Sequence, residues 1–268
     1  MTSVVSDDTE DEMEQVTSGV GTVDAIPEEC IVLEISGEFA HFRKPSTTSP
    51  AQTFGIPPRT TVAGMLAGML GMERDSYYEL FSRETSSVAV SLESSLRRLS
   101  VGINVLTTDG PNTSPTSGRP GKHITGHRQQ TVFEVLCDPI YRVYVGLDDE
   151  TVMDRMEEMF AAGKSVYTLS LGLSEYLATF EFIGRFDVST HTGRATVRTA
   201  VPGEEVDLIP ATDARYVTER SPAFMTTHGE GGRKADGSQT LTYDRNGGPI
   251  ELRETPYAIV DGDPIVFS

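Results

Sequence analysis

The chain has 268 residues, with 40 acidic and 22 basic residues and a formal net charge of −18. Residues 1–29 contain nine acidic and no basic residues, residues 30–147 contain 10 acidic and 11 basic residues, and residues 148–268 contain 21 and 11. A near-neutral segment inside an acidic protein indicates a local anionic partner. No apolar run approaches the ~20 residues that span a bilayer, and no basic or apolar signal region is present. We therefore expect a soluble, cytoplasmic protein with no membrane partner.

The ratio of arginine to lysine and the positions of the two cysteines give further information about the kind of protein. Only four of the 22 basic residues are lysines, and this preference for arginine together with the acidic excess resembles proteins of extreme halophiles. Because screening lengths fall to roughly 3 Å in molar salt, a nucleic-acid site would then depend on short-range arginine contacts. Cys30 and Cys137 each lie in an apolar run, which predicts small buried hydrophobes and no disulfide or metal site.

Within the first 45 residues, the composition changes from acidic to apolar at Cys30. Residues 1–29 are acidic and poor in large apolar groups, which predicts a disordered tail. Residues 30–35 form a continuous β-branched run and predict a central strand. Residues 39–45 follow it with aromatic and basic side chains. Arg43 and Lys44 are positioned to reach phosphates, whereas the neighbouring phenylalanines either stack on bases or, more commonly, are buried.

The segment 57–71 is the best-marked helix of the sequence. Two prolines begin it, Thr60 or Thr61 can cap its free N–H groups, and Gly71 suits the left-handed position after its end. Gly64 and Gly68 lie one turn apart, and each costs about 1 kcal/mol relative to alanine in a helix interior. We favour close packing against this side as the reason, with close approach of a ligand as the alternative.

Arg59 stands in the first turn of this helix, where a cation opposes the helix dipole. An anion at the helix N-terminus would explain it, because free N–H groups, the hydroxyls of Thr60 and Thr61 and a guanidinium together form a plausible phosphate site. The alternative is a solvated surface arginine.

The following elements alternate between strands and helices. We predict strands over 88–92 and 101–106, paired antiparallel strands over 131–136 and 140–145, and strands over 165–171 and 178–186. Between the last two pairs, a helix begins at Asp148 or Asp149 and ends at Gly163. Arg97 and Arg98 stand at the start of a strand, so their side chains point to opposite faces.

Residues 107–128 are rich in glycine, proline, serine and threonine and are too long for an ordinary hairpin loop, which marks them as functional or disordered. Their basic residues gather at the returning end. These residues are Arg119, Lys122, His123, His127 and Arg128. Although His123 and His127 have the i, i+4 spacing of metal ligands, no carboxylate or cysteine is near, so we predict no metal site and no cofactor.

The order of elements is close to the β-α-β-β-α-β order of a ferredoxin-like α+β fold, which also serves as an RRM-like platform for RNA. We place this domain at residues 30–190. Residues 191–268 have short strand candidates between proline- and glycine-rich breaks and are expected to form an irregular C-terminal extension. The stretch 229–234 is glycine-rich and basic but lacks the Walker spacing, which favours a flexible loop.

Three motifs together resemble the CRISPR-associated Cas5 family, the RAMP-type subunit of type I Cascade surveillance complexes. They are Phe42-Arg43-Lys44-Pro45, the helix motif from Pro57 to Leu66, and Gly172-Leu173-Ser174-Glu175-Tyr176-Leu177. The resemblance covers roughly residues 30–186, is closest to the archaeal subtype I-B branch, and a haloarchaeal version would fit the composition.

The resemblance implies a ferredoxin-like RAMP domain with a protruding thumb, for which 107–128 is the candidate. It also implies an RNA-binding subunit, not an enzyme, that caps the 5′ handle of the guide crRNA beside a Cas7 backbone subunit and the large subunit. By this analogy Arg43, Lys44, Arg59 and Thr60 hold handle phosphates. The remaining predicted RNA contacts are Arg97, Arg98, Arg119, Lys122, His123 and Arg128.

Two other functions remain open. One branch of the same family cleaves precursor crRNA without metal, using a tyrosine with a lysine–histidine pair. Lys122 and His123 supply such a pair, and a histidine near neutral pH suits attack by a 2′-hydroxyl, but the tyrosine position holds Phe54, which cannot transfer a proton. The third possibility is a domain that only assembles proteins.

Overall fold

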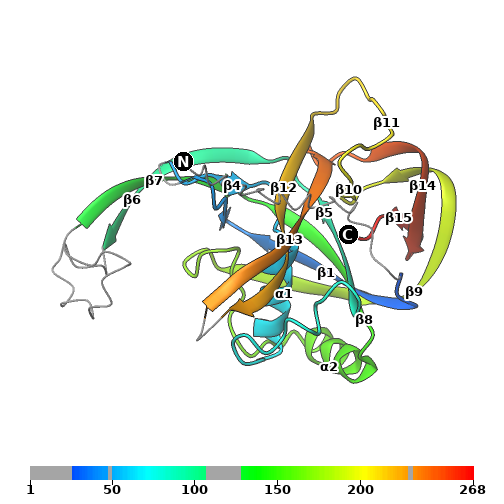
Figure 1. Ribbon diagram of the computed structural model, residues 1–268, viewed down its shortest axis with the longest axis horizontal. Coiled ribbons are helices and arrows are strands. Elements are labelled where there is room, and N and C mark those ends of the chain that lie inside the picture. Colours follow the sequence, from blue (N-terminus) through cyan, green and yellow to red (C-terminus); the bar gives the residue numbers. More distant parts are fainter. Residues whose placement is uncertain (1–25, 48–49, 107–127, 229–231) are drawn as a thin grey trace, which may run out of the picture.

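The structure is a computed structural model that describes residues 26–47, 50–106, 128–228 and 232–268. These residues form a mixed α+β fold in which strands predominate, as the sequence predicts (Figure 1). Within this part of the chain lie two helices, α1 (Arg59–Met69) and α2 (Glu150–Ala161). The strands are β1 (Glu29–Gly37), β2 (Phe39–Ala40), β3 (Phe42–Arg43), β4 (Thr53–Phe54), β5 (Ser86–Leu92), β6 (Arg97–Leu106), β7 (Arg128–Cys137), β8 (Ile140–Leu147), β9 (Ala178–Val197), β10 (Val201–Pro202), β11 (Leu208–Ile209), β12 (Tyr216–His228), β13 (Gly232–Asp244), β14 (Ile250–Val260) and β15 (Asp263–Ile265).

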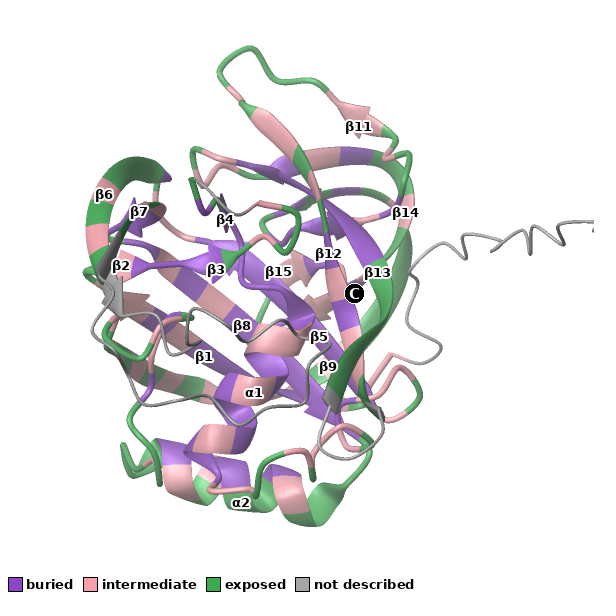
Figure 2. Ribbon diagram, turned by 60° about the vertical axis from the view of Figure 1, so that its left-hand side comes forward, coloured by how far each residue is buried: buried purple, intermediate pink, exposed green. Residues whose placement is uncertain are grey.

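The main sheet has the strand order β11-β14-β9-β1-β8-β5, with β15 paired to β14, and all of these pairs are antiparallel. Strand β1 is central, as its apolar run predicts. Ile31, Leu33 and Ile35 pack with both helices on one face. On the other face Cys30 and Val32 pack with residues near the C-terminal end of the described chain, which explains why β1 has no polar alternation (Figure 2).

Helix α1 connects β1 to β5, and its apolar residues Val62, Leu66 and Met69 are buried. At its end the N–H of Met72 bonds to the oxygen of Ala67 and that of Gly71 to the oxygen of Gly68, which is a Schellman motif. Gly71 has a φ of 71°, as predicted. The predicted threonine cap is wrong, because the N-cap residue is Pro58 and no side chain caps the helix.

Strands β6 and β7 form an arm that leaves the main sheet and pairs with β2 at its base (Figure 1). This arm corrects the predicted pairing of 131–136 with 140–145. The first segment pairs with β6 in the arm and the second pairs with β1 and β5 in the main sheet, and Asp138, which lies between them, has a φ of 50°. The predicted thumb, 107–128, lies outside the described residues except for Arg128, which begins β7.

The C-terminal third is not irregular, contrary to the prediction. The proposed boundary at residue 190 falls within β9, which runs through Val197 and pairs with β14 over residues 188–197. Strands β12 and β13 form a long hairpin, and β12 packs against α1. The predicted strand 165–171 is wrong as well, since it contains one isolated bridge, from Ser170 to Leu177.

Candidate nucleic-acid interface

Two of the predicted basic residues come together at the base of the arm. Lys44 follows β3, and its Nζ lies 2.7 Å from Oε1 of Glu219 on β12. Arg98 is the second residue of β6, and one of its terminal nitrogens lies 3.6 Å from the same oxygen. Glu219 was not singled out from the sequence, because its partners are 175 and 121 positions away and no local pattern marks it.

Glu219 connects four separate segments. Its side chain is 9% exposed, and its Oε2 accepts hydrogen bonds from the N–H of Gly55 and the hydroxyl of Tyr243, both at 2.8 Å. Burial, followed by the charge of Glu219, raises the pKa of Tyr243. Arg98 also pairs with Glu134 of β7; burial alone lowers the pKa of Arg98, but the two carboxylates outweigh it and raise that pKa. The network therefore fixes the arm to the body.

Arg43 and Arg97 are the exposed arginines of the predicted set that make no ion pair with Glu219 among the described residues. The Arg43 side chain is exposed, and it has no ion pair among the described residues. Arg97 pairs with Asp138 at 2.7 Å, with both side chains about 70% exposed (71% and 69%), so the pair is weak and open to competition. Arg97 and Arg98 do point to opposite faces, as strand alternation predicts, since only Arg98 turns toward Glu134 and Glu219.

Arg59 is not on the surface, which corrects its prediction as a phosphate ligand. It is 2% exposed and donates hydrogen bonds to the main-chain oxygens of Ser86 and Ser268 and to the Ser86 hydroxyl. Its guanidinium also lies 4.9 Å from the centre of the Phe224 ring. Burial, with a smaller contribution from the nearby Arg83, lowers the pKa of Arg59 to about 10. Its role is to tie the start of α1 to β5 and to the C-terminal segment.

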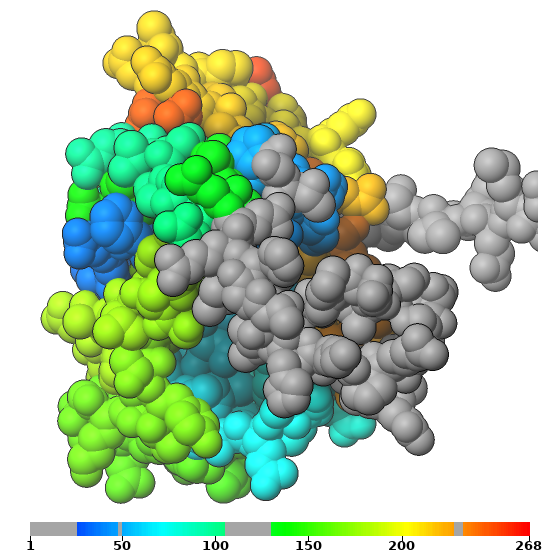
Figure 3. Space-filling view, turned by 90° about the vertical axis from the view of Figure 1, so that its left-hand side faces the viewer, coloured from blue at the N-terminus to red at the C-terminus, as the bar shows by residue number. Residues whose placement is uncertain are grey.

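Thr60 lines a groove of about 290 Å³ along α1. The same wall contains Gly64 and Gly68, and a Cβ added at Gly68 would meet no described atom within 4 Å. Among the described residues, the predicted close packing is not found at Gly68, while a Cβ at Gly64 would meet the Tyr77 hydroxyl, at 3.3 Å. Figure 3 shows residues of this region (cyan) beside the segment that follows α2 (yellow-green).

The loop from Gly172 to Leu177 is the third motif of the resemblance. Gly172 has a φ of 95°, and a Cβ there would lie 2.0 Å from the main-chain oxygen of His41. Only glycine fits this approach, so the first residue of the motif has a structural reason. His41 itself is 1% exposed, and its Nδ1 donates to the oxygen of Glu134 at 2.7 Å.

Several predicted residues cannot be placed. Arg119, Lys122 and His123 lie outside the described residues, and the side chain of Arg128 is not described. Over the described ranges, no three histidine, cysteine or acidic side chains gather as a metal-ion site. Neither described helix has the length and apolar content that crossing a bilayer needs. Both cysteines are buried and free, as predicted.

Comparison with known proteins identifies the family. The model of the CRISPR-associated protein family Cas_Cas5 matches residues 30–246. A CRISPR protein from Archaeoglobus fulgidus is 12% identical, with a TM-score of 0.54 over 89% of this chain and 98% of that one, and so shares the fold. A chain of a CRISPR RNA-guided surveillance complex is 15% identical over 84% of this chain and 91% of its own, with a TM-score of 0.47.

A chain of a type III-B Cmr-beta complex bound to cognate target RNA is 12% identical over 82% of this chain and 86% of its own, with a TM-score of 0.43. No curated protein matches the sequence. The family match extends from β1 through β13 and so includes both helices, the arm and the β12–β13 hairpin. On this match the chain belongs to the CRISPR-associated Cas5 family.

Proposed function

We propose that this protein is a non-catalytic RNA-binding subunit of a type I Cascade complex, in which it caps the 5′ handle of the guide crRNA. The family match over residues 30–246 is the observation that carries the proposal. Related proteins of known structure include a chain of a CRISPR RNA-guided surveillance complex. The expected partners are the crRNA handle, the Cas7 backbone subunit and the large subunit, in the cytoplasm.

The strand order supports a ferredoxin-like RAMP domain. Strands β9, β1, β8 and β5 lie side by side, with α1 between β1 and β5 and α2 between β8 and β9. This arrangement is a split βαβ unit used twice. The arm then takes the place of an insertion between β5 and β8 and so serves as the thumb.

The accessible cations favour RNA contact on the side of the arm. Of the predicted contacts that the structure describes, Arg43 and Arg97 are exposed and make no ion pair with Glu219, and Thr60 is partly exposed. The Arg98 side chain is 31% exposed but is held by Glu134 and Glu219. Lys44 is 24% exposed and paired with Glu219, so it acts on RNA mainly by holding the loop before α1. A subtype I-B, haloarchaeal origin fits the acidic, arginine-rich composition and would make these contacts short-ranged.

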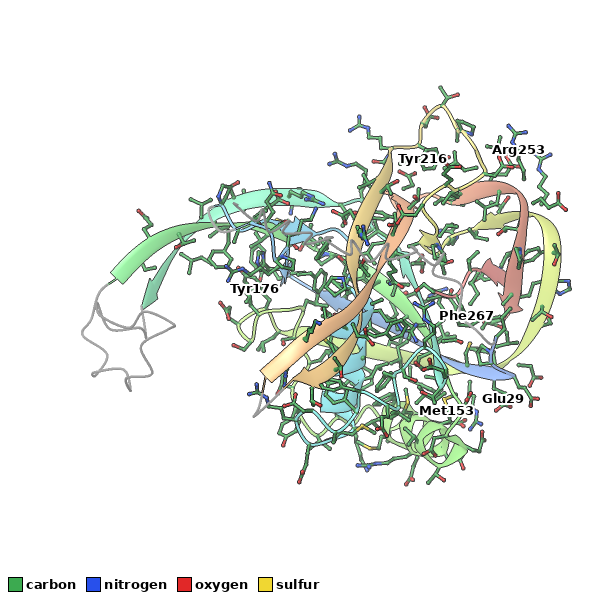
Figure 4. The ribbon with its side chains drawn as sticks, viewed as in Figure 1. Glu29, Met153, Tyr176, Tyr216, Arg253 and Phe267 are labelled. Carbon is green, nitrogen blue, oxygen red and sulfur yellow. The ribbon has the colours of Figure 1, made fainter. Side chains whose placement is uncertain are left out.

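Binding and cleavage of an end-labelled repeat RNA at high salt, in the presence of a chelator, test the function. We expect handle-dependent binding and intact RNA. Arg43→Ala should weaken binding and reduce the slope of log affinity against log salt by about 0.7, the value for one phosphate contact on a single strand. Arg253→Ala is the matched control, because Arg253 is an exposed arginine on β14, far from Tyr176 and the arm (Figure 4).

Each alternative predicts a different result. A discrete metal-independent cut in the repeat, lost in Lys122→Ala or His123→Ala, would make the protein an endoribonuclease. Phe54 argues against that outcome, since it is 4% exposed and its side chain has no ionisable proton to transfer. Failure to bind the repeat RNA, with assembly of other subunits intact, would identify a protein-only assembly module.

A further inference from the structure

The groove along α1 is lined by a second segment as well. Besides Thr60, Gly64 and Gly68, its lining contains residues 167–170 and Gly172, which follow α2, and Arg233 of β13. At about 290 Å³ the groove is near the lower end of the roughly 300–1,000 Å³ typical of small-molecule sites. A space of this size suits one nucleotide-sized group.

Tyr167 is an exposed aromatic ring on an anchored backbone. On one side of it, the N–H of Val166 bonds to the Met69 oxygen at 2.8 Å, and on the other, Leu169 is 5% exposed in the core. Tyr167 itself is 62% exposed, the highest value among the large hydrophobic residues described. An aromatic ring that is open to solvent on a fixed backbone is suited to stacking, because its backbone has little conformational entropy left to lose.

The groove also contains Arg233, whose guanidinium keeps hydrogen-bond donors available for a ligand. Nε of Arg233 bonds to Asp75 at 2.6 Å, and Asp75 accepts a second bond from the Tyr78 hydroxyl, also at 2.6 Å. Among the described residues, the two terminal nitrogens of Arg233 have no partner, and its side chain is 38% exposed. Asp75 therefore orients the guanidinium without using its full capacity, which leaves a bidentate face for an anion.

The opposite wall allows close approach. Gly64 and Gly68 present helix backbone where other residues would present side chains, and Thr60, Thr61 and Tyr77 add hydroxyl groups that donate or accept hydrogen bonds. The groove thus combines an aromatic face, an oriented cation and hydroxyl groups. These are the features with which proteins hold single-stranded nucleic acid.

We propose that this groove binds one unstacked nucleotide of the guide RNA, with its base against the ring of Tyr167 and its phosphate at Arg233. The inference rests on the proposed function, since it names where one nucleotide of the bound RNA lies. Stacking on tyrosine tolerates any base, so the contact adds affinity without reading sequence.

The test measures binding of the full chain to the repeat RNA and to a series of RNAs that each contain one abasic nucleotide. We expect Tyr167→Ala to weaken binding of intact RNA about tenfold, whereas Tyr167→Phe, which keeps the ring, stays close to the wild type. One abasic position should cost the wild-type protein about the same factor. Combined with Tyr167→Ala, that abasic RNA should lose nothing more, because both changes remove the same stack.

Leu177→Ala is the control, because Leu177 is 59% exposed and lines a different pocket. Arg233→Ala should lower the salt slope by about 0.7, as for one phosphate. Unchanged binding by Tyr167→Ala, or losses that multiply to about a hundredfold in the combined case, would overturn the groove assignment while leaving RNA binding intact. If the wild-type protein fails to bind the repeat RNA at all, the proposed function itself is wrong, and the groove assignment falls with it.

Discussion

Replacing Gly68 by alanine adds a single methyl group to the wall of the groove. The new Cβ meets no described atom within 4 Å, and the Gly68 backbone lies outside the left-handed region. The folded structure therefore accepts the change without strain. Because glycine inside a helix is less stable than alanine by about 0.5–1 kcal/mol, the free energy of unfolding should increase by that amount.

For a chain of this size, such a gain raises Tm by about 1–4 °C. Binding of the repeat RNA should change in the opposite direction and weaken several-fold, because the methyl group stands where we place a nucleotide. If Gly68→Ala is more stable but binds RNA less well, the glycine is present so that a ligand can approach the helix, and not so that the protein can pack closely there.

Thermal unfolding and RNA titration of the same preparations test whether Tm increases and whether RNA affinity decreases. Gly71→Ala is the matched control, since its φ is 71° and an added Cβ would lie 2.8 Å from the nearest Val166 atom. That variant should lose about 1–3 kcal/mol. A lower Tm for Gly68→Ala would mean that an unidentified part of the chain packs there. A higher Tm with unchanged RNA affinity would mean that the RNA takes another path.

Three further predictions concern buried polar groups. Arg59→Ala should cost about 3 kcal/mol or more in urea unfolding, because the oxygens of Ser86 and Ser268 lose a charged donor; an unchanged midpoint would contradict its structural role. Glu219→Ala should lower stability by about 1–3 kcal/mol and Glu219→Gln by less, since the glutamine retains one acceptor oxygen for its buried donors; equal losses in the two variants would argue against the network. Burial lowers the pKa of His41 below its ordinary value of 6.5, against the raising effect of its bond to the Glu134 oxygen, so the unfolded chain binds the proton more tightly and stability should fall as the pH drops through 6.5 toward the folded-state pKa. His41→Asn, which keeps a side-chain N–H, should remove that part of the pH dependence between about pH 7.5 and 5.5, and an unaltered profile would exclude His41 as its source.

The sequence predicted the elements whose cause is local. The apolar run of β1, both helices and the left-handed Gly71 follow from residues within a few positions of one another. The same holds for the N-cap of α2, where Asp149 accepts from the N–H of Val152. Propensity, periodicity and capping act over a single turn or strand, so their effects can be predicted from the sequence alone.

What the sequence missed depends on distant partners. The C-terminal strands alternate too weakly to predict regular structure, yet β14 is held by β9 and the last residues are buried against β1 and β5. Likewise, local pattern pairs residues 131–136 of β7 with residues 140–145 of β8, the next strand along the chain, whereas β7 pairs with β6, which lies farther away in the sequence. Tertiary pairing overrides local pattern most readily in such strands.

In the candidate site, too, the features that the sequence could not predict depend on distant partners, and here the partners are those of the charged side chains. The sequence predicted several cations as RNA contacts, but it could not rank them, because burial and counter-ions decide which are accessible. Arg59 is enclosed by main-chain oxygens, and Arg98 and Lys44 share Glu219, whereas Arg43 is exposed. An arginine is informative about a ligand only once its partners inside the protein are known. Arg233, whose single carboxylate partner occupies one of three nitrogens, is for that reason a stronger candidate for an RNA phosphate than Arg59.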